Sequence, residues 1–275
     1  MATPIPIVCP YCGVGCNLEL SLDEHGRPFK SKAAGRNPEL NGKYLCVKGI
    51  TIHELLNHEE RLSQPFIRKA DKLELVSWEE AVTAASRGLK DIISKYGPES
   101  VGMLCSGKIL NEEVYLSQKF QRAVIGNNHV DNCARLCHGP SEAALRQQLG
   151  FGAVSTFLED YDATETVFVV GAHTTFTHPI IWMSVKKRAK RGGLKLIVAD
   201  PRETDLIKNA AVHLKVKPGM DIFWLNALGK IIIDKGWQDQ AFCEKHTIGF
   251  NAVRKATENF DINAACARAG VERSE

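Results

Sequence analysis

The sequence predicts an α/β protein in which a small cysteine-rich domain is followed by doubly wound α/β domains. Residues 1 to about 60 are rich in cysteine, glycine and proline and contain little periodic apolar sequence. From about residue 61 onward, short apolar runs alternate with segments of helical periodicity. Two of these runs, TVFVVGA and LKLIVAD, are joined by a helical segment, which predicts neighbouring parallel strands buried on both faces. We expect domains at residues 1–60, 61–135 and 136–275.

Composition excludes several classes of protein. The 275 residues are 44% hydrophobic and 24% charged, which is typical of a globular protein, and the net charge of +3 gives no reason to expect nucleic acid as a partner. No stretch approaches the roughly 18 apolar residues of a membrane span, and the first residues lack a secretory signal pattern. Nine cysteines, three of them within eight positions, suit a metal centre in a reducing compartment, so we expect a cytoplasmic protein.

The first elements follow from local signals. CNLELSL reads as a strand, but residues 1–60 lack an ordinary core, so something other than packing must hold them together. A helix is expected after Ser77, which forms a capping box with Glu80, and Gly97-Pro98 should end it. Its apolar face consists of Trp78, Ala81, Val82, Ala85, Leu89, Ile92 and Ile93.

Strands and helices then alternate to the end of the chain. The sequence predicts a strand at SVGMLCS, a helix at NEEVYLSQKFQRAVIG and a short segment at NHVDNCA. Cys137 and His138 therefore lie just past a strand, directly before Gly139-Pro140. The alternation continues through a helix at HPIIWMSVKKRAKR, a turn at Gly192-Gly193, the run AVHLKVK and a helix at MDIFWLNALGKIII. Its basic run KKRAKR is typical of a solvated helix end.

Three loops are candidates for a nucleotide site. GAHTTFTHP, DPRETD and PGMD follow predicted strands, and ligands of such sheets bind outside the carboxyl ends of the strands. Asp200 and Asp221 in these loops could equally serve as turn or capping residues. No GxGxxG pattern follows a strand, which argues against an ordinary NAD-binding fold.

The amino-terminal cysteines indicate a metal centre. Cys9, Cys12 and Cys16 have the spacing C-x2-C-x3-C, and Cys46 is a distant fourth thiol. Glycines in PYCGVG would let backbone amides approach the sulfurs. Zinc is the alternative, but structural zinc sites more often pair two short knuckles, so three cysteines plus one favour an iron–sulfur cluster.

The ordered motifs carry a family resemblance. The segments, in chain order, are CPYCGVGC, YLCVKG, NEEVYLSQKFQRAVIGNNHVDNCARLCHGPS, HP followed by GGLKLIVADPRETD, and KPGMD. Together they resemble the catalytic subunit of molybdenum- or tungsten-dependent formate dehydrogenases, within the molybdopterin oxidoreductase family. The resemblance implies a 4Fe-4S cluster in residues 1–60 and the first part of an α/β domain in residues 61–135. It further implies a bis(molybdopterin guanine dinucleotide) cofactor with Mo or W, with a pterin guanine dinucleotide bound by residues 136–275.

The resemblance also assigns roles to residues. Cys9, Cys12, Cys16 and Cys46 would ligate the cluster, and Lys48 would lie between the cluster and a pterin. Cys137 would bind the metal, and His138 would take part in formate chemistry. The dinucleotide tails would be held by Lys108, Gly171, Asp200, Arg202, Gly219 and Asp221. Two residues depart from the family pattern: His173 stands where relatives commonly carry Asn, and Met220 replaces a usual hydroxyl residue.

Length and the remaining cysteines leave alternatives open. Catalytic subunits of the family are much longer than this chain, so we expect a fragment or one half of a split enzyme whose second chain supplies the rest. The substrate pair would be formate and carbon dioxide, and electrons would pass to further redox subunits carrying iron–sulfur or flavin centres. CHGPS favours this reaction over a cytoplasmic nitrate reductase. The chain could also be a cluster-bearing subunit without turnover.

Structural thiols are expected at Cys105, Cys133, Cys243 and Cys266, although Cys133 is close enough in sequence to Cys137 to line the same site.

Overall fold

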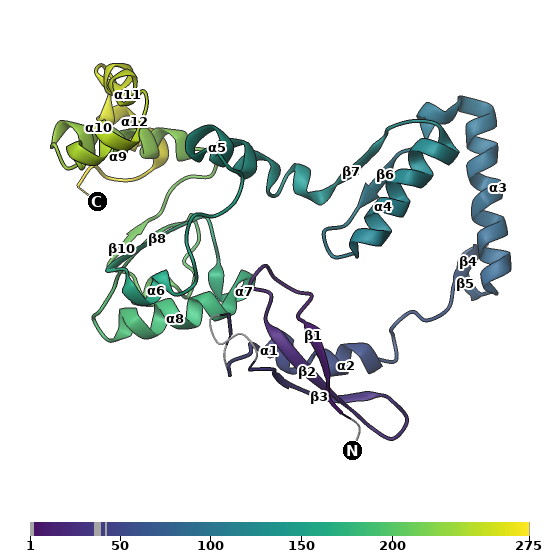
Figure 1. Cartoon of the computed structure of the whole chain (residues 1–275). Helices are drawn as coiled ribbons and strands as arrows, with labels where there is room; N and C mark the ends of the chain where they lie inside the picture. The colour runs from purple at the N-terminus through teal and green to yellow at the C-terminus, as the bar shows by residue number, and fades with distance from the viewer. Residues whose placement is uncertain (1–2, 36–39, 42, 275) are drawn as a thin grey trace. The chain divides into compact units, whose positions relative to one another are not determined.

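A computed structural model describes residues 3–35, 40–41 and 43–274. The chain divides into two compact units. The first unit comprises residues 1–11 and 15–157, and the second comprises residues 12–14 and 158–275 (Figure 1). Within the described ranges, no helix has the length and apolar character that a bilayer crossing requires.

The first unit begins with a small antiparallel sheet. Its strands pair in the order β1 (Ile5–Val8), β2 (Asn17–Leu22) and β3 (Pro28–Ala33). The short helices α1 (Val47–Ile50) and α2 (Ile52–Asn57) follow it. Leu18 of β2 is fully buried, and the Ser31 hydroxyl on β3 contacts the carbonyl oxygens of Gly49 and Ile50, each at 2.6 Å. The predicted strand at CNLELSL is confirmed, and a polar contact joins the sheet to α1.

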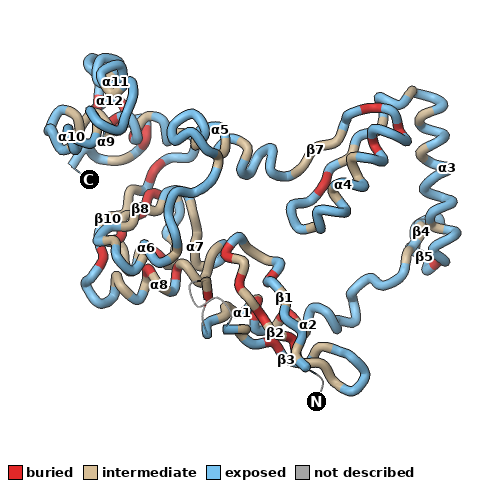
Figure 2. The backbone as a smooth tube through the Cα atoms, in the orientation of Figure 1, coloured by how far each residue is buried: buried red, intermediate tan, exposed pale blue. Residues whose placement is uncertain are grey.

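A hairpin and a long helix come next. The hairpin pairs β4 (Phe66–Lys69) with β5 (Lys72–Leu75), and α3 (Trp78–Tyr96) follows it. The Ser77 hydroxyl accepts the Glu80 N–H at 3.1 Å, and Gly97 ends α3 with φ of 82°, so the predicted cap and stop are confirmed. None of the residues of α3 is buried, and Figure 2 shows the helix exposed along nearly its whole length. The predicted apolar face therefore has no core beneath it in the described part of the chain.

A parallel strand pair leads to the predicted thiol–imidazole segment. The elements are β6 (Met103–Cys105), α4 (Asn111–Lys119), a π-helical turn (Phe120–Ile125), β7 (Val130–Asn132) and α5 (Gly139–Leu149). Gln121 is fully buried and donates through its amide nitrogen to Asn127 Oδ1 at 2.6 Å and to the Val101 carbonyl at 2.8 Å. The predicted position of Cys137 and His138 just past a strand is confirmed.

The second unit is built on a parallel sheet. Its strands are β8 (Thr166–Val170), β9 (Lys195–Ala199) and β10 (Val212–Leu214), paired in the order β10-β9-β8. The helices before, between and after these strands are α6 (Asp160–Ala163), α7 (Thr174–Thr177), α8 (Pro179–Lys190), α9 (Asp221–Asp234), α10 (Gln240–His246), α11 (Phe250–Thr257) and α12 (Ile262–Ala269).

Helices cover both faces of this sheet, as a doubly wound fold requires. On one face, Trp182 and Val185 of α8 pack with Leu196 and Val198 of β9. The opposite face is covered by α9, whose Trp224 packs with Ala199. Because alternate residues of a strand point to opposite faces, these contacts confirm the predicted architecture.

One expectation about this sheet was wrong. The sequence predicts that TVFVVGA is buried on both faces, but Phe168 and Val170 are 41% and 42% exposed. The reason is that β8 is the last strand of the sheet in the described order β10-β9-β8, so it has a hydrogen-bonded neighbour on one side only. Phe168 still contacts Trp224 edge-on, with ring centroids 5.9 Å apart.

Candidate functional site

The cysteine loop is closed by its own backbone. Cys9 N–H donates to the Cys16 carbonyl at 2.8 Å, and Gly15 takes a left-handed φ of 67° between them. Both cysteines are buried, whereas Cys46 is half-buried and its carbonyl accepts the N–H groups of Gly49 and Ile50 at 3.0 Å. Cys12, also half-buried, lies at the tip of the loop, residues 12–14, which groups with the second unit.

The donor set of this region fits an iron–sulfur cluster. All four predicted cluster residues carry a thiol side chain, and thiolates are the ligands of 4Fe-4S clusters. Among the described residues, no three His, Cys, Asp or Glu side chains gather closely enough to hold one metal ion. A 4Fe-4S cluster does not need three ligands around one ion, because each of its irons takes one cysteine.

Two predicted cofactor residues converge on one aromatic ring in the first unit. Lys48 Nζ lies 6.0 Å from the centroid of Tyr11, and Lys108 Nζ lies 5.6 Å from it. An ammonium group is attracted to the face of such a ring. Tyr11 stands between two cysteines of the motif, so this ring brings both cationic groups next to the cysteine loop.

The segment that carries Cys137 is a tight turn. Cys137 is exposed, and its N–H donates to the Cys133 carbonyl at 3.2 Å. Cys133 Sγ accepts the Gly107 N–H at 3.2 Å, and a Cβ on Gly107 would lie only 3.1 Å from that sulfur. Cys133 therefore joins the loop of Lys108 to the turn of Cys137, a link that the sequence left undecided.

His138 is the N-cap residue, directly before helix α5. Its carbonyl accepts the Glu142 N–H at 2.7 Å, and its Nε2 lies 3.3 Å from the Gly152 carbonyl. Because a carbonyl can only accept, a hydrogen bond here requires the hydrogen on Nε2. Gly139 follows because a Cβ there would lie 3.1 Å from the Ala134 oxygen that accepts the His138 N–H.

The predicted dinucleotide residues of the second unit share one edge of the parallel sheet. Gly171 follows β8 with φ of 60°, and its N–H donates to the Ala199 carbonyl of β9 at 2.9 Å. Gly219 has φ of 77°, and Asp221 is the first residue of α9, where its Oδ1 accepts the Trp224 indole N–H at 3.3 Å. The strands thus bring these loops together as predicted.

Two buried hydroxyls make this edge suitable for a polar ligand. Thr174 Oγ1 follows β8 and Thr204 Oγ1 follows β9, and neither has a hydrogen-bond partner among the described residues. A buried polar group without a partner costs about 1–3 kcal/mol. A ligand rich in hydroxyls and phosphates, such as a nucleotide, would relieve that cost, so the residues present fit the implied group.

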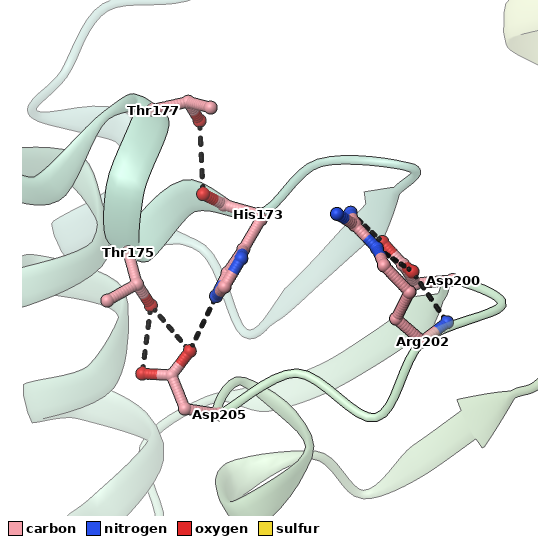
Figure 3. A network of polar contacts seen from close by, with 6 residues as sticks. All are labelled: His173, Thr175, Thr177, Asp200, Arg202 and Asp205. Carbon is pink, nitrogen blue, oxygen red and sulfur yellow. Dashed lines mark hydrogen bonds and ion pairs between the residues drawn. The ribbon is translucent and has the colours of Figure 1, made fainter.

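Asp200 forms an ion pair with Arg202 (Figure 3). The Asp200 carboxylate is 1% exposed and accepts Arg202 Nε and Nη2, each at 3.0 Å, together with the Arg202 backbone N–H at 2.8 Å. These hydrogen bonds outweigh burial and hold the pKa of Asp200 below its ordinary value. Asp200 therefore orients Arg202, whose remaining N–H groups suit a phosphate. The turn chemistry that the sequence allowed for Asp200 is also present.

The Asp200–Arg202 pair predicts an acid-dependent loss of stability. A carboxylate with a lowered folded-state pKa stabilises the fold above its ordinary value of 3.8 and loses that effect as the pH falls. Arg202→Gln should lower stability at pH 7 because it takes the charged partner from the buried Asp200 carboxylate, and solvent screening at the 61% exposed Arg202 side chain should moderate the loss. Thermal unfolding of parent and variant should differ at pH 7 and converge as the pH falls below 3.8 and through the lowered folded-state pKa of Asp200.

The exposed pair Asp131–Arg135 provides the control for that measurement. Its N···O distance is 2.8 Å, and its side chains are 44% and 73% exposed. Solvent screening should make Arg135→Gln nearly neutral at pH 7. An Arg202→Gln effect that does not depend on pH would contradict the role assigned to Asp200.

Sequence reasoning missed several partners of the predicted residues. Asp205 and Thr175 contact each other, Asp205 also contacts His173, and Gly152 contacts His138. Asp205 could have been suspected, since it and His173 follow adjacent parallel strands. Nothing in the local sequence around Gly152 indicates its contact.

Comparisons with known proteins agree with the motif order. The family model described as "Molybdopterin oxidoreductase" matches residues 61–267, and that described as "Molybdopterin oxidoreductase Fe4S4 domain" matches residues 5–58. Formate dehydrogenase H of Escherichia coli is 40% identical over 98% of this chain. The F420-dependent formate dehydrogenase 1 subunit alpha of Methanococcus maripaludis is 36% identical over 97% of it.

These relatives are longer proteins. The chain spans 38% of the length of the first and 39% of the second. Acetylene hydratase from Pelobacter acetylenicus has the same fold over 97% of this chain and 37% of its own, with a TM-score of 0.75 and 22% identity. Since one family model covers most of the chain, the chain belongs to the molybdopterin oxidoreductase family, with residues 5–58 as its Fe4S4 domain.

Proposed function

We propose that this chain forms part of the catalytic subunit of a molybdenum- or tungsten-dependent formate dehydrogenase, which oxidises formate to carbon dioxide or runs the reverse reaction. The observation that carries the proposal is the exposed Cys137–His138 pair, which the fold presents between β7 and the start of α5. Two relatives named as formate dehydrogenases favour this reaction over nitrate reduction. Fold likeness alone does not select a reaction.

The cofactors follow from the same assignment. Cys9, Cys12, Cys16 and Cys46 would hold a 4Fe-4S cluster within a domain of residues 1–60. A bis(molybdopterin guanine dinucleotide) would be bound through residues 136–275, with residues 61–135 as the first part of an α/β domain. The resemblance assigns its guanine dinucleotide tails to Lys108, Gly171, Asp200, Arg202, Gly219 and Asp221.

The chemistry divides between the cofactor and the chain. When bound, the molybdenum or tungsten centre supplies the acceptor for the two electrons of formate. Cys137 contributes a thiolate, a soft ligand that suits such a metal. His138, the chain neighbour of Cys137 and the N-cap of α5, would take the proton that formate loses, while its Nε2 faces the Gly152 carbonyl.

The route for electrons would leave through the cysteine loop. Lys48 lies beside Tyr11, and Tyr11 is part of the cysteine motif. A cation at this position can interact with both a pterin and a cluster. Further redox subunits would receive the electrons, and a second chain could supply the remaining part of a split enzyme. The cysteine usage supports a reducing, cytoplasmic location.

The test is an elemental and catalytic analysis of the native enzyme that contains this chain, purified without oxygen together with its companion polypeptides. We expect about four irons per chain, molybdenum or tungsten, and dye reduction with formate. Zinc near one per chain with little iron would contradict the cluster. Turnover with nitrate and none with formate would replace the proposed reaction by the alternative.

A further inference from the structure

Side chains join the loops that follow β8 and β9. His173 Nε2 lies 2.9 Å from Asp205 Oδ1, and Thr175 Oγ1 donates to both oxygens of Asp205 at 2.9 and 3.0 Å (Figure 3). We call His173, Thr175 and Asp205 the loop clamp. His173 and Thr175 lie after β8, whereas Asp205 lies after β9, so the clamp connects two loops that are about 30 residues apart in the sequence.

The imidazole of the clamp is held on more than one side. The rings of Phe176 and His173 meet edge to face, with centroids 4.5 Å apart. The His173 carbonyl accepts the Phe176 N–H at 3.0 Å. It also accepts the Thr177 hydroxyl at 3.2 Å, as Figure 3 shows. The His173 side chain is 21% exposed. The Phe176 and Asp205 contacts hold the imidazole itself, and the two bonds to the carbonyl hold the backbone of its loop.

The charge state of Asp205 strengthens the clamp. Burial alone would raise the pKa of Asp205, but hydrogen bonds from His173 and Thr175 outweigh burial and lower it. The carboxylate is therefore ionised near neutral pH and can only accept, so Nε2 of His173 must donate. Hydrogen bonds to charged groups are stronger than those between neutral groups.

The clamp stands among the predicted nucleotide-binding residues. His173 comes two residues after Gly171, and Asp205 comes three residues after Arg202. A positive charge on His173 would lower the pKa of Asp200, which places the two networks within electrostatic reach of each other. Thr174 and Thr204, whose buried hydroxyls lack partners among the described residues, are neighbours in sequence of the clamp residues.

We propose that the loop clamp is the positioning device that holds the β8 and β9 loops in the arrangement that receives the nucleotide tail of the pterin cofactor. His173 and Asp205 act through the loops and are positioning residues for Gly171 and Arg202. The inference rests on the proposed function for the identity of the ligand. The joining of the loops follows from the contacts alone.

Two substitutions of His173 separate the clamp from other roles of the imidazole. The amide nitrogen of His173→Gln can occupy the place of Nε2 and still donate to Asp205. The shorter side chain of His173→Asn can reproduce Nδ1 but does not reach Asp205. If His173 acts through the clamp, His173→Gln keeps the function and His173→Asn loses it. If His173 contacts the ligand directly through Nδ1, His173→Asn keeps the function and His173→Gln loses it. Asp205→Ala should behave like His173→Asn.

The experiment compares these variants in the full enzyme by two measurements. Amide hydrogen exchange of residues 171–177 and 201–206 should become about tenfold faster or more in His173→Asn and Asp205→Ala, as expected for a lost charged hydrogen bond. Guanine nucleotide released by acid hydrolysis, counted per chain after long dialysis, should fall at least about threefold, since loosened loops bind less tightly. His173→Gln should match the parent in both.

A matched control uses the other tie between loops of this edge. Lys215 Nζ lies 2.8 Å from Glu203 Oε1, but both side chains are largely exposed. Glu203→Gln should therefore leave both measurements unchanged. Equal behaviour of the Gln and Asn variants of His173, or nucleotide loss with Gln alone, would overturn the clamp. A parent enzyme without guanine nucleotide would overturn the proposed cofactor, and the exchange comparison would still decide whether the clamp joins the loops.

Discussion

Cys137→Ser is expected to lower formate-dependent dye reduction by more than about a hundredfold in the enzyme that contains this chain, since a lost ligand should exceed the roughly 10–100-fold effect of outer-shell partners. A serine hydroxyl remains protonated near neutral pH and is a hard donor, so it replaces the thiolate poorly. Iron per chain should stay at the parental value, because the cysteine loop lies elsewhere in the sequence. Assays should therefore report turnover, iron and molybdenum or tungsten on the same preparation.

Cys133→Ser is the matched control for this variant. Cys133 stands four residues before Cys137 and accepts the Gly107 N–H through sulfur. A serine oxygen there can accept the same hydrogen, so turnover should change by less than about threefold. Parental turnover in Cys137→Ser, or an equal loss in both variants, would contradict the ligand role of Cys137.

Cys16→Ala is expected to remove the cluster and to destabilise residues 5–58. Iron should fall from about four per chain to below about one, and formate turnover should be lost with it. Most residues of the small sheet are exposed or intermediate, as Figure 2 shows, so we expect cluster binding to supply much of its folding free energy. Thermal unfolding of the full enzyme should gain an early transition in the variant.

Cys243→Ala tests whether the loss of a thiol outside the cysteine motif would give that result. Cys243 lies in α10, far in sequence from the cysteine motif, and its loss should leave iron and turnover at the parental values. If Cys16→Ala retained the parental iron, the assignment of the cluster ligands would be wrong. Cys137→Ser and Cys16→Ala also separate the metal-ligand role from the cluster-ligand role, because Cys137→Ser should keep the iron and Cys16→Ala should lose it.

Local signals were sufficient for much of the fold. Ser77 and Glu80 predict the start of α3 because a side chain reaches the N–H three residues on, and Gly97 predicts its end because glycine accepts a positive φ. The rule for parallel strands brought the loops of Gly171 and Asp200 to one edge. The burial of β8 was overestimated, because position within a sheet is not a property of the strand itself.

The amino-acid sequence by itself determined the cysteine-rich domain, the parallel sheet with helices on both faces, and the family of the chain. Only the tertiary structure decided that Asp200 is committed to Arg202, that Cys133 receives the Gly107 N–H, and that His173 meets Asp205. The physical reason is the sequence separation between the groups that interact. Caps and turns are set by groups within a few residues, whereas contacts between loops depend on how whole strands pair and where each side chain is then left to bond.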